Sequence, residues 1–393
     1  MRFRRRPGVA PLGPSRAITA ALAAVAATTL IAACSSGSSS SPASGGTSTG
    51  SASTTAETPI GVDLTYNNTA FWAAYINYEN QYAKQLHIKM LGPLLAGNNA
   101  NVQNTQIETL VNEGAKAIVV NPETATSLGP AISYAAKHGV QLISVDTIVG
   151  VGHVYMVVRA SNLEYGLDAC AAMSSKFKSG YVLDLEGDLT SSNGADRTNA
   201  FNQCMAKNAP NVHILKAPTN WITATAVTDA QNAVNAYGSQ LKGIYSQWSS
   251  PDTGIIPLLK SKGLTGKVLL VSDDGVPFEM CDITHGTLTA SQSQPANLYA
   301  YWALKYAQDA ANGVKLTAGQ PGGGAPTLAM VSFGGTSNLG DPIVPPFVTK
   351  SAQTLQVTPV DGLSGAVATT PVTNASLWGN VYGNAHGGVC SSS

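Results

Sequence analysis

The sequence predicts an α/β protein of two lobes, each built on a parallel sheet. Short apolar runs rich in Val, Ile and Leu alternate with stretches in which apolar residues recur every three or four positions, the patterns of buried strands and amphipathic helices. This alternation starts afresh near His153, so it forms two series. Because strands that alternate with helices pair in parallel, each series predicts one sheet covered by helices. The part from about Pro59 onward is long enough for two domains of the usual ~150 residues.

The first series begins with a strand at 60–64 and a helix in which aromatic residues recur every three or four positions, at Phe71, Tyr75, Tyr78 and Tyr82. Proline restricts the residue before it, so Asn121-Pro122 ends a later strand. Gly139 terminates a helix, since glycine accepts the left-handed backbone found at helix ends. The other expected elements of this series are a helix at 102–112, a strand at 117–120, a helix at 127–137 and a strand at 140–145.

The second series continues the alternation as far as a long last helix near 298–311. Beyond Gly313 the chain is rich in Gly, Pro, Ser and Thr and has few periodic segments, so only 342–348 is a candidate for a final strand. The expected strands lie at 154–158, 181–185, 212–216, 243–245, 268–272 and 287–290. The expected helices lie at 163–175, 197–207, 224–236, 253–262 and 276–284.

Residues 1–33 have the pattern of a lipoprotein signal peptide. A basic start is followed by the apolar stretch 17–33, and the stretch ends in Ile31-Ala32-Ala33-Cys34, which resembles the box in which the cysteine is lipidated and becomes the first mature residue. The alternative is an uncleaved membrane helix, which needs about 20 predominantly apolar residues, more than this stretch supplies. The basic residues of the start are Arg2, Arg4, Arg5, Arg6 and Arg16.

Residues 34–58 are nearly all Ser, Gly, Thr, Ala and Pro, a composition that cannot bury a core and predicts a disordered tether. Acyl chains on Cys34 would hold the tethered protein at the outer face of the bacterial cytoplasmic membrane. The whole chain has 22 basic and 22 acidic side chains, so removal of the arginine-rich leader leaves an excess of acidic ones. Nucleic-acid binding needs a basic face, and the sequence has none.

Cysteine usage fits an exported protein. Four cysteines remain besides Cys34, an even number for an oxidising compartment. Cys170 and Cys204 fall on neighbouring expected helices and form one candidate disulfide, and Cys281 with Cys390 would fix the C-terminal tail as the other. Free buried thiols are the open alternative, because spacing alone does not determine connectivity. The six histidines are scattered without metal-ligand spacing, and no cofactor or metal is expected.

Several short motifs occur in an order that is more specific than any one of them. They are Phe71-Trp72, 106–114, 117–122, 144–146, Ser161-Asn162, 196–198, 272–275 and 292–295. On these motifs the chain, from Ile60 to about Gly313, resembles the ribose-type periplasmic sugar-binding proteins, the type I solute-binding proteins of ABC importers, in a lipoprotein form. The resemblance implies two flavodoxin-like lobes joined by a three-strand hinge, with a ligand between them at the carboxyl ends of the strands and closure about the hinge.

The resemblance also divides the chain. It implies an N-terminal lobe of 59–160 and 293–320, a C-terminal lobe of 161–292 and 321–350, and a C-terminal extension of 351–393. The extension is longer than the family needs, and Cys390 would attach it to a lobe.

The ligand-binding residues are carried over from the matching positions of the family. Phe71, Trp72 and Trp221 correspond to aromatic residues that stack on a sugar ring, which has apolar faces as well as hydroxyl groups. Asp146 and Asp274 correspond to binding carboxylates, and Arg197 to an arginine whose planar guanidinium can span adjacent hydroxyls. Either Gln292 or Gln294 corresponds to a glutamine of the last crossing strand, and Asp273 is the alternative to Asp274. The complete set is Phe71, Trp72, Asp146, Arg197, Trp221, Trp248, Asp274 and Gln292.

Three positions depart from the family pattern. Thr147 follows Asp146 where relatives usually have arginine, Trp248 replaces an asparagine, and Thr69 stands where asparagine is frequent. Loss of the charge and gain of an indole suggest a smaller, flatter or less hydroxylated ligand than ribose.

The sequence therefore predicts a binding protein, not an enzyme. It is expected to act as a monomer, to capture a monosaccharide or related polyol, and to deliver it to the membrane permease of an ABC importer. The alternatives are a binding protein for a non-sugar small molecule and a sensory ligand-binding module. A glycosidase would need an acid and a base such as Asp146 and Asp274, but these match binding positions. A sugar-sensing repressor would need a helix-turn-helix where the export signal stands.

Overall fold

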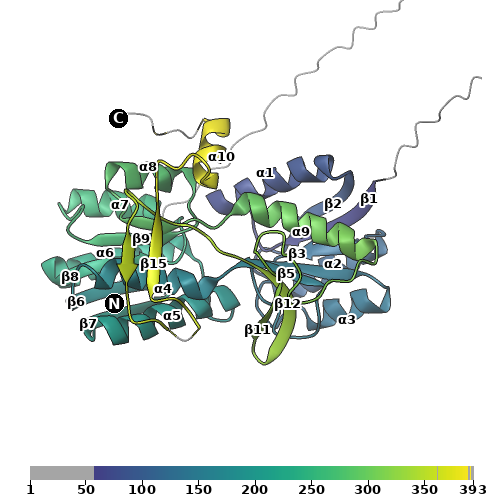
Figure 1. The fold of residues 1–393 in the computed structure, drawn as a ribbon, viewed down its shortest axis with the longest axis horizontal. Coiled ribbons are helices and arrows are strands. Elements are labelled where there is room, and N and C mark those ends of the chain that lie inside the picture. The colour runs from purple at the N-terminus through teal and green to yellow at the C-terminus, as the bar shows by residue number, and fades with distance from the viewer. Residues whose placement is uncertain (1–56, 361, 388–389, 391–393) are drawn as a thin grey trace, which may run out of the picture. The chain divides into compact units, whose positions relative to one another are not determined.

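The computed structural model describes residues 57–360, 362–387 and 390, and these form two sheets with helices on both faces (Figure 1). The leader 1–33, the lipidation residue Cys34 and nearly all of the expected tether lie outside the described residues. Among the described residues, none of the helices has the length and apolar character needed to cross a membrane.

The first sheet has the strand order β11-β12-β5-β4-β3-β1-β2. Helices α1 and α9 pack together on one face with the core around Tyr75 and Tyr299, and α2 and α3 cover the other face around Ile107 (Figure 1). The strands are β1 (Thr58–Leu64), β2 (Ile88–Leu95), β3 (Ala117–Val120), β4 (Gln141–Val145), β5 (Met156–Ala160), β11 (Ala329–Phe333) and β12 (Thr336–Ile343). The helices are α1 (Ala70–Gln85), α2 (Ala100–Asn112), α3 (Gly129–Lys137) and α9 (Ala296–Ala311).

The second sheet has the order β14-β15-β13-β10-β9-β8-β6-β7. Helices α4 and α5 form one core with Phe201 and Tyr245, and α6, α7 and α8 form another with Ile244 and Ile255. The strands are β6 (Ser179–Glu186), β7 (Asn211–Pro218), β8 (Leu241–Ser246), β9 (Leu269–Asp273), β10 (Ala290–Gln292), β13 (Phe347–Thr349), β14 (Thr354–Gln356) and β15 (Ala366–Pro371). The helices are α4 (Asn162–Ser174), α5 (Ser192–Asn208), α6 (Thr223–Tyr237), α7 (Asp252–Ser261), α8 (Pro277–His285) and α10 (Trp378–His386), with a short 3-10 helix η1 at Gly238–Gln240.

Three segments of the described chain pass between the sheets, at 160–162, 292–296 and 343–347. They are joined by hydrogen bonds: the amide of Ser161 donates to the carbonyl of Ile343 at 3.3 Å, and the amide of Ser293 donates to the carbonyl of Pro346 at 2.9 Å. The two-lobe α/β fold predicted from the alternating pattern is confirmed.

Residues 329–343 correct the expected lobe boundaries. The sequence analysis assigns 321–350 to the C-terminal lobe, but β11 and β12 belong to the first sheet, where β12 pairs in parallel with β5. Buried Asp341 of β12 fixes this arrangement, because it accepts hydrogen bonds from the hydroxyl of Tyr306 on α9 at 3.0 Å and from the amide of Ala325 at 2.7 Å. The chain passes to the second sheet only after Ile343.

Two further differences concern the first lobe. β2 was not predicted, because Gly92-Pro93 interrupts its apolar pattern; proline is tolerated there since β2 lies at the edge of the sheet. β1 begins at Thr58, one residue inside the expected tether.

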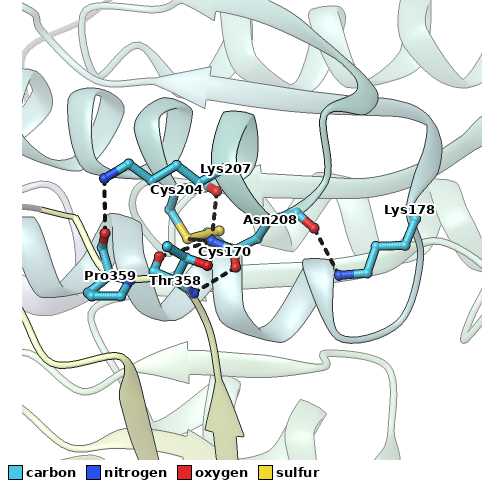
Figure 2. The surroundings of a disulfide bond; sticks show 7 residues. All are labelled: Cys170, Lys178, Cys204, Lys207, Asn208, Thr358 and Pro359. Atoms are coloured by element: carbon cyan, nitrogen blue, oxygen red, sulfur yellow. Dashed lines mark hydrogen bonds between the residues drawn. A yellow bond between two sulfur atoms is a disulfide. The ribbon is translucent and has the colours of Figure 1, made fainter.

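Both candidate disulfides are present, which confirms the expected pairing. Cys170–Cys204 joins α4 to α5, and Cys281–Cys390 joins α8 to the C-terminal tail. Beside the first bridge the tail is held by the end of α5 (Figure 2): Asn208 exchanges hydrogen bonds of 2.7 and 3.0 Å with the backbone of Thr358. The part of the extension that β14 and β15 form is thus built into the second lobe.

Candidate functional site

A cavity of about 470 Å³ lies between the two lobes and is lined by residues of both; it is called the cleft below. Seven of the eight predicted ligand-binding residues line it: Phe71, Trp72, Asp146, Arg197, Trp221, Trp248 and Asp274. Gln292 does not line the cleft, whereas Gln294 does. The structure thus answers both open choices of register: Gln294 and Asp274 face the cleft, and neither Gln292 nor Asp273 is among its lining residues.

The two carboxylates stand at corresponding places in the two lobes. Asp146 directly follows β4 and Asp274 directly follows β9, each at the carboxyl end of a parallel strand. Both have a positive φ, 70° for Asp146 and 106° for Asp274, a backbone conformation that is costly for residues with a side chain. Such strain is found where the surrounding structure holds a functional group in place, and here it turns each chain sharply at the rim of the cleft.

Asp146 is held by amides. One of its oxygens accepts a hydrogen bond from Asn193 of α5 at 2.5 Å, and the other accepts from Gln294 at 3.1 Å. Burial raises the pKa of Asp146, and the positive charges of Arg197 and Arg159 oppose that shift. The donors from α5 and from the crossing segment link this first-lobe carboxylate to the second lobe.

Arg197 lies one helical turn after Asn193 on α5, so the two side chains project from the same face of the helix. Its guanidinium donates to the side chain of Asn162 at 2.6 Å, to Gln294 at 2.9 Å and to the backbone carbonyl of Gln247, and it lies 3.4 Å from Asp273. It also lies over the ring of Tyr165, 4.3 Å from the centroid. The charge is therefore fully partnered within the protein.

Only one of the two carboxylate oxygens of Asp274 accepts hydrogen bonds from described residues. Its Oδ2 accepts hydrogen bonds from the amide of Ser249 at 2.9 Å and from the Ser249 hydroxyl at 2.7 Å, while Oδ1 has no partner among the described residues. Burial raises the pKa of Asp274 to about 6, although Arg197 and the Ser249 hydrogen bonds oppose the shift. Beneath it, burial raises the pKa of Asp273 to about 7 against the opposing charge of Arg197.

The first lobe supplies one aromatic wall. Thr69 caps α1 by accepting a hydrogen bond from the amide of Trp72 at 3.1 Å, which places Phe71 and Trp72 in the first turn of that helix. Their rings pack edge to face at 5.1 Å, and Phe71 packs in the same way against Trp378 at 6.1 Å. Both side chains line the cleft, although little of either is exposed.

The second lobe supplies the other aromatic wall. Trp221 and Trp248 pack edge to face with centroids 5.4 Å apart. Any side chain at Gly187 would meet the Trp221 ring at 2.1 Å, so that glycine allows the indole to lie flat on the strand end. Trp248 lines the cleft, but its indole nitrogen is buried and has no hydrogen-bond partner among the described residues.

The structure adds residues to the predicted ligand-binding set. Asn193, Asn121 and Tyr66 also line the cleft, as does Thr147, which the sequence analysis noted only as a departure from the family's arginine. Asn193 could have been found from its place one turn before Arg197. Tyr66 and Asn121 each lie just beyond the carboxyl end of a strand, β1 and β3, the signal that identified Asp146.

The arrangement suits recognition of a neutral polar molecule. Aromatic faces can cover an apolar ring face, while the free oxygen of Asp274 offers an acceptor. A metal-binding group of three or more His, Cys, Asp or Glu side chains is not found among residues 57–360, 362–387 and 390.

Comparison with protein families gives one match. The profile described as "Periplasmic binding protein domain" covers residues 60–315 of this chain. Among curated proteins, the chain is 28% identical over 253 residues to the xylitol-binding protein of Mycolicibacterium smegmatis, covering 63% of this chain and 71% of that protein. It is 26% identical over 203 residues to the D-allose-binding periplasmic protein of Escherichia coli, covering 49% and 65%. It is 22% identical over 261 residues to the ribose import binding protein of Bacillus subtilis, covering 66% and 84%.

Solved structures share the fold. An ABC transporter solute binding protein of Mycobacterium smegmatis with bound glycerol superposes with a TM-score of 0.62 at 22% identity, over 66% of this chain and 90% of that chain. A periplasmic solute binding protein of Actinobacillus succinogenes with bound D-allose superposes with a TM-score of 0.64 at 19% identity, over 75% and 98%. At these identities the likeness shows the architecture of two lobes and no more.

Proposed function

Because the chain belongs to the periplasmic binding protein domain family, we propose that it captures a small polyhydroxylated molecule, a monosaccharide or a polyol, in its cleft and delivers it to an ABC importer. The family is one of binding proteins rather than enzymes and implies a location outside the cytoplasm. The relatives named for xylitol, D-allose and ribose support this class of ligand.

The observation that carries the proposal is the pairing of aromatic walls with strand-end carboxylates around one cavity. A sugar ring has apolar C–H faces that stack on indole and phenyl rings, and hydroxyl groups that donate to carboxylates and accept from N–H groups. The cleft offers Trp221 and Phe71 for the faces, and Asp274 for the hydroxyls. Its volume of about 470 Å³ lies within the range of sites for small molecules.

Capture would proceed by bending at the three crossing segments. Contacts between the lobes that pass through Gln294, which accepts from Arg197 and donates to Asp146, would then form or adjust around the ligand. Lipidation of Cys34 and the Ser-rich tether would keep the monomeric binding domain close to the importer while leaving it free to turn.

A screen of ligands tests the proposal. Pentoses, hexoses, pentitols and inositols are added singly to the purified protein and its melting temperature is measured; a ligand of the folded state raises it in proportion to the logarithm of concentration over Kd. We expect at least one compound to stabilise the protein and to do so less in the Trp221→Ala variant. Trp302→Ala, which removes another partly buried tryptophan away from the cleft, serves as the matched control. Absence of stabilisation by the whole panel would contradict the proposal.

A second candidate is a flatter, less hydroxylated ligand. It is favoured by Trp248, whose buried indole occupies the position of a polar family residue, and by Thr147, which brings no charge. Mass spectrometry of material that stays bound through gentle purification distinguishes the two: a polyol or sugar supports the first candidate, and an aromatic or other poorly hydroxylated compound supports the second.

A further inference from the structure

A second cavity of about 690 Å³ lies beside the crossing segments; it is called the rear cavity below. Its walls come from α4, the start of α9, the segment 344–347, β15 and the segment before α10. It shares no lining residue with the cleft. Ser293 and Pro295 line the rear cavity and Gln294 between them lines the cleft, the alternation expected when an extended chain separates two spaces.

Two acidic side chains of α4 dominate the polar part of the rear cavity. Glu164 and Asp168 are four residues apart, so they project from the same face of the helix. The Asp168 residue is only 8% exposed, and Glu164 Oε2 is buried with no hydrogen-bond partner among the described residues. The lining contains no Lys, Arg or His, and neither carboxylate is in an ion pair within the described part of the chain.

Other buried polar atoms of the rear cavity also lack partners within the described residues. They are the Ser293 hydroxyl, in a residue 1% exposed, and the Asn297 side-chain oxygen. Both can accept hydrogen bonds, and a buried polar atom that is left unpaired is costly. These buried atoms place further acceptors beside the two carboxyl groups that line the cavity, so the polar wall suits a ligand that brings donors.

Electrostatics favours a donor with a positive charge. Burial raises the pKa of Asp168 well above its usual value, and the neighbouring Glu164 raises it further. Burial also raises the pKa of Glu164. A cation placed between the two carboxyls would reverse both effects, because an opposite charge favours the ionised form.

The rest of the wall is apolar. Leu167 of α4, Leu298 of α9, Val367 of β15, and Leu377 and Trp378 before and in α10 surround the space. A hydrated metal ion would gain nothing from these side chains, and two carboxylates fall short of the usual ligand number for one. From this pairing of acids that have no basic neighbour with an apolar wall, we propose that the rear cavity binds a small organic ammonium ion whose apolar body packs against Leu298, Val367 and Trp378.

The test compares two probes of similar shape and different charge. Cyclohexylammonium chloride and cyclohexanol are each titrated into the full-length protein by isothermal titration calorimetry at pH 8. We expect the ammonium ion to bind with 1:1 stoichiometry and at least tenfold more tightly than the alcohol. Equal binding of the two probes, or no detectable binding of the ammonium ion, would overturn the proposal.

Variants locate the site. The double variant Glu164→Gln/Asp168→Asn keeps the shape of both side chains and should weaken cyclohexylammonium binding tenfold or more. Glu113→Gln, which removes an exposed carboxylate at the C-terminal end of α2 in the first lobe, should leave it unchanged. Leu298→Trp narrows the rear cavity while it leaves both carboxyl groups in the chain, and it should also weaken binding tenfold or more; melting curves of the ligand-free variants show whether they are folded.

Binding that survives both the double variant and Leu298→Trp would place the ammonium ion elsewhere and refute the assignment. The result is independent of the cleft: the screen with sugars and polyols can fail while the rear cavity binds its cation, and the reverse can also hold, since the two cavities have no lining residue in common.

Discussion

The cleft and the rear cavity both contain acidic residues, but they differ in how those charges are partnered. In the cleft, Asp146 accepts from two amides and Arg197 donates to three residues while lying near Asp273. In the rear cavity, Glu164 and Asp168 have no basic neighbour among the lining residues. The number of acids in a site is thus a weaker guide to its ligand than whether the protein has already neutralised them.

The difference has a physical consequence for binding. A ligand that enters the cleft can exchange hydrogen bonds with a network in which Arg197 already opposes the charges of Asp146 and Asp274, so a neutral molecule is not penalised for lacking a charge. A ligand in the rear cavity gains most if it supplies the charge that is missing, because buried carboxylates without a partner are costly.

The largest predicted effect comes from breaking the network of the cleft. Arg197→Met removes the positive charge that faces buried Asp273 and Asp146, and we expect it to lower the free energy of unfolding by about 3–5 kcal/mol, as for a buried pair that loses one partner. Urea denaturation followed by circular dichroism measures the change.

Lys305→Met is the control for Arg197→Met. It removes a cation that is 33% exposed and pairs with Asp309 one turn along α9, so its cost should stay below about 1 kcal/mol. If the two variants were destabilised equally, the cleft network would not contribute more than a surface ion pair.

The same substitution at two aspartates should have opposite signs. Asp146→Asn replaces an acceptor oxygen with an NH2 group that must face the amides of Asn193 or Gln294, and we expect a loss of about 1–3 kcal/mol in the free energy of unfolding. Asp168→Asn removes a buried carboxyl without a basic partner, and we expect it to stabilise the protein at pH 8, because burial opposes the ionised form of Asp168 and does not act on a neutral amide in this way.

The effect of Asp168→Asn should depend on pH. Because the pKa of Asp168 is raised in the folded state, the folded protein holds a proton that the unfolded chain has lost, and stability on account of this group falls as pH rises. Below the ordinary pKa of 3.8 the unfolded chain also holds the proton, so the advantage of Asp168→Asn should shrink as the pH falls towards 4. A constant advantage between pH 4 and pH 8 would show that Asp168 does not titrate as its burial requires.

Strand ends were the part of the cleft that could be predicted from sequence. Asp146 and Asp274 follow apolar runs that could hardly be anything but buried strands, and parallel strands bring their carboxyl ends to one edge. The two-lobe fold followed from the same runs. The resemblance of short motifs in order then placed Phe71, Trp72 and Arg197 beside them.

The remainder depended on contacts that no local pattern encodes. The choice between Gln292 and Gln294 depends on where β10 ends: Gln292 is the last residue of that strand, whereas Gln294 lies in the segment that crosses between the sheets, and strand ends are the least certain part of a prediction from sequence. The strands β11 and β12 lie in a stretch rich in Gly and Pro, where propensity predicts no strand; pairing with β5 and the hydrogen bonds to Asp341 supply the order instead. The rear cavity is formed by segments as distant in sequence as α4 and β15, so nothing in the sequence suggested it.

The smallest predicted effect concerns the pH dependence of ligand binding in the cleft. The pKa of Asp274 is raised to about 6, and its free oxygen is the acceptor proposed for a ligand hydroxyl. Protonation turns that acceptor into a donor, so affinity should fall as pH drops through about 6, by up to about tenfold between pH 8 and pH 5, equivalent to about 1.4 kcal/mol.

The contribution of Asp274 to the stability of the free protein should change in the opposite sense. Between the ordinary pKa of 3.8 and about 6 only the folded state holds the proton, so stability falls as pH rises through that window. Calorimetric titration of the ligand found in the screen, from pH 5 to pH 8, measures how the affinity changes with pH. Asp274→Asn should bind more weakly at pH 8 and with a flatter pH profile, whereas an unchanged profile would mean that another group, with Asp273 at about 7 the nearest, controls binding.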